Sequence, residues 1–85
     1  MMILAVFRSR SHSLDYAERL NAYGVTATTV SAPKEANVGC GICVRFDARY
    51  FVRAKAVLKT GGYASFKGFY KMEYIGANLF VAPYR

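Results

Sequence analysis

Hydrophobic positions change their spacing along the chain, and each change predicts an element. Residues Met2–Phe7 form a continuous apolar run, which is typical of a central strand covered on both faces. Between Leu14 and Tyr23 the apolar side chains recur at helical spacing, and Gly24 is placed to end that helix. Ser11 or Ser13 is expected at its N-cap. The side chains expected to face the core are Leu14, Ala17 and Leu20, with Tyr16 and Tyr23 at the margin.

Two more strands and a second helix are predicted in the middle of the chain. Val25–Ser31 is rich in Val and Thr, and Ile42–Phe46 alternates apolar residues with Cys43 and Arg45. Asp47 is expected to cap a helix over residues 48–60 that ends at the Gly-Gly pair 61–62. The apolar arc of that helix comprises Tyr50, Phe51, Ala54, Val57 and Leu58.

Residues 63–74 alternate and predict a fourth strand, bent at Gly68. One side of this strand is expected to carry Ala64, Phe66, Tyr70, Met72 and Tyr74. A turn over residues 75–78 and a short fifth strand over residues 79–82 follow. The order strand-helix-strand-strand-helix-strand is that of the α+β, ferredoxin-like split βαβ fold. We therefore expect an antiparallel sheet with two helices on one face and a possible extra C-terminal strand.

At 85 residues the chain is expected to form one domain over residues 1–85. Its formal charge of +7 is uneven: residues 1–40 hold four basic and three acidic side chains, and residues 41–85 hold eight and two. This favours anionic partners; the alternative is that much of the charge serves solubility alone. Two cysteines make no disulfide framework, and we see no secretory signal or membrane span. The expected location is the cytoplasm.

Cys40 is the candidate reactive group. It stands between Gly39 and Gly41, which give it little side-chain cover and allow a sharp turn that would present the thiol. In the predicted fold this turn lies at the end of the sheet where the first helix begins. Positive charge and free helix amides favour the thiolate, which is the reactive form. The alternative is a small residue tolerated in a tight turn. Groups expected to support the anion are Arg10, His12, Lys34 and Lys59.

The stretch Ser31–Phe46 resembles a family of small bacterial domains described as selenium/sulfur carrier-like proteins. The resemblance rests on Pro33, Lys34, Cys40, Gly41 and Arg45, and it covers about the first 60 residues. It implies a carrier or accessory protein that holds a persulfide or selenopersulfide on Cys40. A sulfurtransferase or cysteine desulfurase-type protein would be the donor. No cofactor is expected, and the chain is more readily a carrier than a self-standing enzyme.

Other interpretations compete with this one. Cys43 is expected to be a packed sheet residue; a redox pair with Cys40 would need a bulge, because side chains three apart on a strand diverge. Two Cys and one His cannot close a zinc site alone, so no metal is expected. The stretch Lys67–Tyr74 is similar to an RNA-recognition signature, with Lys67 and Phe69 as its key residues. A basic RNA-binding module, or a homodimeric scaffold paired through the open sheet face, remains an alternative.

Overall fold

The computed structural model describes residues 1–34 and 41–84, and these form an α+β fold with one sheet and two helices. The strands are β1 (Met2–Phe7), β2 (Ala27–Ser31), β3 (Ile42–Asp47), β4 (Phe66–Ile75) and β5 (Asn78–Tyr84). The helices are α1 (Arg10–Ala22), a short 3-10 helix η2 (Ala48–Tyr50), and α2 (Phe51–Gly61). The predicted order of elements is confirmed.

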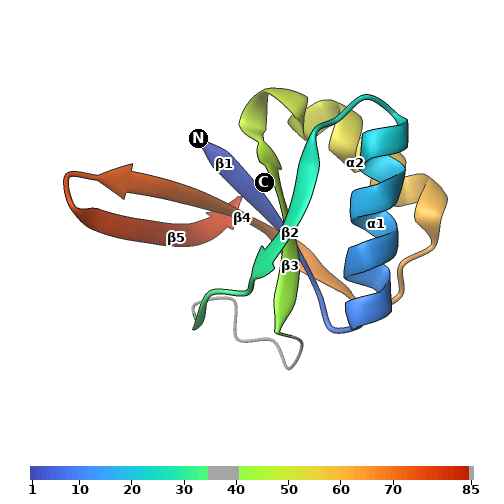
Figure 1. Ribbon diagram of the computed structural model, residues 1–85, viewed down its shortest axis with the longest axis horizontal. Helices are drawn as coiled ribbons and strands as arrows, with labels where there is room; N and C mark the ends of the chain where they lie inside the picture. The colour runs from blue at the N-terminus through green and yellow to red at the C-terminus, as the bar shows by residue number, and fades with distance from the viewer. Residues whose placement is uncertain (35–40, 85) are drawn as a thin grey trace.

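The sheet is antiparallel, with the strand order β2-β3-β1-β4-β5. Its first four strands have the ferredoxin-like arrangement, and β5 extends the sheet beyond β4. Both helices pack on one side, and the β4–β5 hairpin extends away from them (Figure 1). The fold class expected from the sequence is therefore the observed one.

The main core lies between the sheet and the helices. Alternate residues of β1, namely Ile3, Ala5 and Phe7, point into it because side chains on a strand alternate between faces. The hydroxyl of Tyr16 donates a hydrogen bond to the carbonyl of Ala54 at 2.6 Å, which links α1 to α2 inside this core. The apolar arc predicted for the second helix also packs here, through Tyr50, Phe51, Ala54, Val57 and Leu58.

The first helix differs from its prediction in both its start and its buried side. It begins at Arg10, and its N-cap is Ser9, whose side chain accepts from the amide of His12. Neither Ser11 nor Ser13 is the cap. The buried stripe is Ser13, Tyr16, Ala17 and Leu20, whereas Leu14 and Tyr23 are largely exposed. Because polar Ser13 lies on the buried face, the buried stripe is rotated from the stripe that the hydrophobic residues alone predict.

The fourth strand begins at Phe66, later than predicted, and changes face at Gly68. The register with β1 shifts between Val6 and Phe7, where Val6 pairs with Gly68 and Phe7 with Phe66. Gly68 has φ of 145°, a value that favours glycine. Because of this bulge, Phe66 points to the helix side, while Tyr70 and Met72 point to the opposite side. The prediction that Phe66 shares a face with them was wrong.

Candidate functional site

The first turn of α1 is held beside the start of β3. Ser9 has an extended backbone and caps the helix, and its carbonyl accepts from the amide of Ser13 at 3.2 Å. The fully buried hydroxyl of Ser13 donates to the carbonyl of Ile42 at 3.4 Å. The positive end of the helix dipole therefore lies next to the residue where β3 begins.

The connection between β2 and β3 closes at this same end of the sheet. The amide of Ala32 donates to the carbonyl of Gly41 at 3.0 Å, and Gly41 is exposed. A Cβ added at Gly41 would meet nothing within 4 Å, so space rather than crowding surrounds it. Cys40 directly precedes Gly41 in the sequence. Cys40 and Gly39 lie outside the described residues.

His12 is fixed at this end by the segment that follows α2. Its Nδ1 lies 2.6 Å from the hydroxyl of Ser65, whose oxygen also accepts from the amide of Ser9 at 3.2 Å. The imidazole ring contacts the rings of Phe7 and Tyr63, with centroids 6.5 and 5.5 Å away. The chain leaving α2 thus returns to the first turn of α1.

The three other basic residues expected to support the cysteine differ in where they lie. Arg10 is the first residue of α1 and is exposed at this end. Lys34 is exposed two residues after Ala32, which is hydrogen-bonded to Gly41. Lys59 is exposed near the end of α2, and the described residues provide no contact between it and the first turn of α1. Arg10 and His12 therefore lie at the start of α1, and Lys34 lies close in sequence to Ala32, which is hydrogen-bonded to Gly41.

Cys43 lies on the face of the sheet opposite the helices and is fully buried. Its cluster contains Leu4 and Val6, with Tyr70 and Met72 packed against it. This confirms the interpretation of Cys43 as a packed sheet residue. Leu4 and Val6 are also fully buried, so the apolar first strand leaves little of its own surface open for pairing through this face. The guanidinium Nε of Arg45 is buried on the same face and has no hydrogen-bond partner among the described residues.

A polar cluster beside this end was not anticipated from the sequence. The hydroxyl of Tyr63 donates to Asp15 at 2.5 Å and accepts from Arg19 at 3.2 Å. Burial, followed by the hydrogen bond to Asp15, raises the pKa of Tyr63. The hydrogen bond to Tyr63 raises the pKa of Arg19. These groups fix the chain between α2 and β4 against α1, and so position Ser65 beside His12.

The RNA-binding interpretation requires Phe69 to be accessible for stacking on a base, and the structure does not expose it. Phe69 is only 9% exposed, and its ring packs against Phe46, Phe51 and Phe66 with centroids 5.0 to 6.2 Å away. A base would stack on this ring only if the ring left the core. Lys67 is exposed and could still contact phosphate, but a lysine alone carries no such function.

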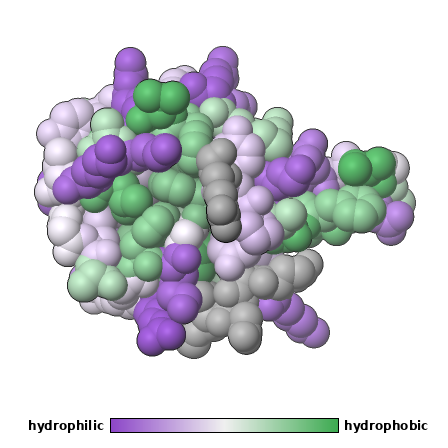
Figure 2. All heavy atoms as spheres, turned by 180° about the vertical axis from the view of Figure 1, so that it is seen from behind, coloured by the Kyte–Doolittle hydropathy of each residue, from purple (hydrophilic) through white to green (hydrophobic). Residues whose placement is uncertain are grey.

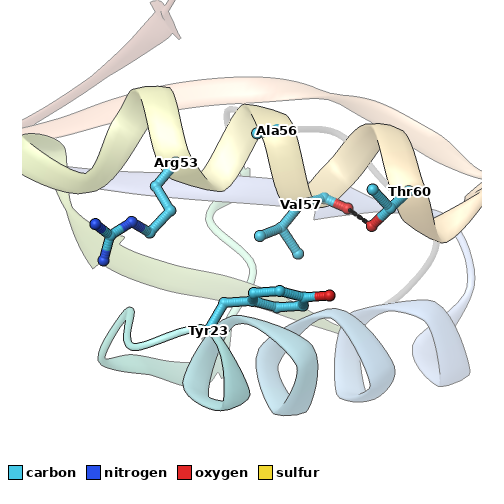
Figure 3. A pocket seen from close by; sticks show the side chains of 5 residues that line it. All are labelled: Tyr23, Arg53, Ala56, Val57 and Thr60. Atoms are coloured by element: carbon cyan, nitrogen blue, oxygen red, sulfur yellow. Dashed lines mark hydrogen bonds between the residues drawn. The ribbon is translucent and has the colours of Figure 1, made fainter.

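A hollow of about 240 Å³ lies between the two helices, away from Gly41 (Figure 3). Its lining is mostly apolar and comprises Tyr23, Arg53, Ala56, Val57 and Thr60. Thr60 uses its hydroxyl to bond the carbonyl of Val57 at 2.8 Å, as the dashed line in Figure 3 shows. None of these side chains is a cysteine, histidine or acid. The hollow therefore offers a ligand no thiol, imidazole or carboxylate.

The protein is thus an α+β domain in which the capped start of α1 lies at the same end of the antiparallel sheet as the start of β3. A family model described as "Putative Se/S carrier protein-like" matches residues 2–71, and the chain belongs to that family. The match includes every residue singled out around Gly41 and extends further than the resemblance seen in the sequence. No curated protein and no solved structure matches the chain. Neither described helix has the length and apolarity needed to cross a bilayer.

Proposed function

We propose that this protein carries sulfur or selenium on Cys40, held as a persulfide or selenopersulfide. The observation that carries the proposal is membership of the Se/S carrier-like family over residues 2–71. The described surroundings support it, because the start of α1 and the exposed Arg10 lie at the end of the sheet where Gly41 begins the approach to β3. A helix start and a cation both stabilise a thiolate.

The proposed loading step is a sulfur transfer without net redox change. The Cys40 thiolate attacks the terminal sulfur of a persulfide on a donor protein, forming a new S–S bond. The S–S bond within the donor persulfide breaks, and the donor cysteine leaves as a thiolate. The donor is a sulfurtransferase or cysteine desulfurase-type protein. Selenium would follow the same route from a selenopersulfide. A reducing cytoplasm fits this chemistry, since it keeps the resting thiol reduced.

The experiment is intact-protein mass spectrometry after incubation with a protein persulfide donor, followed by reduction of a second aliquot. We expect a mass increase of one sulfur atom on the wild-type chain, which reduction removes. Cys40→Ser should abolish the increase. Cys43→Ala is the matched control and should load like the wild type, because Cys43 is buried on the other face of the sheet. Equal loading of wild type and Cys40→Ser, or no loading of the wild type, would refute the proposal.

A further inference from the structure

The β4–β5 hairpin projects beyond the rest of the sheet. β1 pairs with β4 only from Phe66 to Met72, so within the described chain residues 73–80 pair only with each other. Figure 1 shows this hairpin extending away from the helices, and Figure 2 shows hydrophobic residues gathered at its end. β5 is the last strand of the sheet, so its outer edge pairs with no other strand of the described chain.

The composition of this hairpin differs from that of the rest of the chain. Residues 74–84 contain no charged side chain, in a protein with 12 basic and 5 acidic residues. Four large side chains here are well exposed: Tyr74 (72%), Ile75 (61%), Leu79 (40%) and Phe80 (51%). Natural edge strands are usually protected by charges, bulges or short length, and β5 has none of these over Asn78–Val81. The edge is thus open to strand pairing.

The register of the hairpin decides which backbone groups face that edge. Ile75 pairs with Asn78 across a two-residue turn, which makes this pair a hydrogen-bonded one. Counting along the strand from this pair, every second residue of β5 directs its backbone N–H and C=O groups towards β4. The residues between them direct their backbone N–H and C=O groups to the open edge of β5. The outward residues are Leu79, Val81 and Pro83. Proline has no N–H, so within the described strand Asn78–Tyr84 the complete outward donor and acceptor sets belong to Leu79 and Val81.

We propose that two copies of this chain pair their β5 strands antiparallel across a two-fold axis at Phe80. In this register the N–H and C=O of Leu79 bond to Val81 of the second copy, and those of Val81 bond to its Leu79. A register centred on Val81 would instead set Leu79 against Pro83, which cannot donate. Only the Phe80-centred pairing uses both complete residues and places the two Phe80 rings directly opposite each other.

The absence of charge favours a second copy as the occupant, and the available area sets how strong the association is. Because the paired strands carry no charge, the net charge of +7 on each copy is not concentrated at the contact. The four exposed side chains present on the order of 450 Å² of apolar surface, compared with about 800 Å² per partner in a standard interface. The association should therefore be specific but weak, and its extent should rise with protein concentration.

The primary measurement is sedimentation velocity across a concentration series. We expect the mass to rise from 9.5 kDa towards twice that value as the concentration increases. Phe80→Lys should weaken dimerisation at least about tenfold, since it sets two like charges directly opposite each other. The matched control is Val52→Lys, which introduces the same charge at an exposed valine of α2 and should dimerise like the wild type.

Disulfide trapping tests the register. In a chain with Cys40→Ser and Cys43→Ala, Phe80→Cys should cross-link on mild oxidation, because directly opposite non-hydrogen-bonded residues have Cα atoms about 4.5 Å apart. Ala82→Cys is the control: the two copies of residue 82 would be about 14 Å out of register. A monomer at all concentrations, loss of the dimer on Val52→Lys alone, or equal trapping at both positions would overturn the proposal. Monomers that instead bind an extended peptide of another protein would overturn it as well.

Discussion

Cys43 is fully buried among apolar side chains, so at this position the sulfur contributes to packing. Replacing the thiol by a hydroxyl places a more polar group next to Leu4 and Val6. We expect Cys43→Ser to lower the free energy of unfolding by about 1–3 kcal/mol. Cys43→Val keeps an apolar side chain and should cost less. Urea denaturation measures both. Equal stability of the serine and valine variants would show that polarity at this site is unimportant.

The Tyr16 phenol links pH to stability. Burial, and secondarily the nearby Tyr63, raises the pKa of Tyr16 above its ordinary value of about 10. In the unfolded chain this phenol ionises first as the pH rises, whereas the native state keeps its proton. Its contribution to stability is therefore complete below pH about 10 and is lost progressively as the pH rises above that value.

Tyr16→Phe tests this linkage. Near pH 7 the variant should lose about 1 kcal/mol, because the hydrogen bond to Ala54 is removed. Above pH 10 its stability should fall less steeply than that of the wild type. Tyr74→Phe, which removes an exposed hydroxyl, is the control and should follow the wild-type profile. Urea denaturation at a series of pH values supplies the comparison, and parallel curves for Tyr16→Phe and wild type would contradict the linkage.

The charge of Arg10 should influence the reactivity of Cys40 if the proposed carrier site is correct. The expected thiolate midpoint of the wild type lies below the ordinary value of about 8.5, and Arg10→Ala should move it upward. Arg49→Ala is the matched control, since Arg49 follows the opposite end of β3 and pairs with Asp47. The measurement is the rate of iodoacetamide alkylation of Cys40 against pH. Identical midpoints in all three proteins would exclude a role for Arg10.

At the level of single elements, Gly68 sets which side chains of β4 face the helices. Its φ of 145° is unfavourable for residues with a Cβ, although a Cβ there would meet nothing within 4 Å. Gly68→Ala should therefore destabilise the fold through the backbone alone, by about 1–2 kcal/mol. Gly41→Ala is the control, because its Cβ also has open space and its φ lies outside the left-handed region. Thermal unfolding compares the two, and a neutral Gly68→Ala would mean that the bulge relaxes at no cost.

The elements themselves were predictable because their local signals agree. The apolar run of β1 corresponds to a central strand, and Gly62 is the left-handed C-cap of α2. Asp47 caps the 3-10 helix η2 rather than α2, whose N-cap is Tyr50, so the expectation that Asp47 caps the second helix was wrong. The start of α1 was not predictable from hydroxyl position alone, since three serines stand at alternate positions and only the fold selects Ser9. The face of Phe66 was missed because a bulge inverts the alternation without leaving a sign beyond one glycine.

The candidate site was predictable only in part, for a related reason. Arg10 and His12 were named because the topology places the start of α1 near the turn before β3. Ser13, Ser65 and Tyr63 were missed, since they act through contacts between segments 29 to 53 residues apart. A buried serine in a helix and a tyrosine after Gly-Gly carry no local signal of such contacts. Lys59 was also expected at this end because of the topology, but the described residues provide no contact between Lys59 and the first turn of α1.

Across the whole molecule, the family match and the sheet do not end together. The match stops at residue 71, whereas β4 continues to Ile75 and β5 adds seven residues to the sheet. β5 is nonetheless attached to the core, because the ring of Tyr84 packs against Phe51 with centroids 4.7 Å apart. The extra strand therefore covers one edge of the matched region and provides the uncharged edge proposed for dimerisation.

The uneven charge of the molecule should make its stability depend on salt. Residues 1–34 and 41–84 contain three ion pairs, all between at least partly exposed side chains that contribute little, so repulsion among the excess cations is only weakly offset. Sodium chloride screens this repulsion over about 10 Å at 0.1 M, and we expect the midpoint of thermal unfolding to rise by a few degrees. The double variant Lys55→Glu and Lys59→Glu, which lowers the formal charge by four, should be less sensitive. A midpoint that falls with salt in the wild type would show that its charge distribution is stabilising on balance.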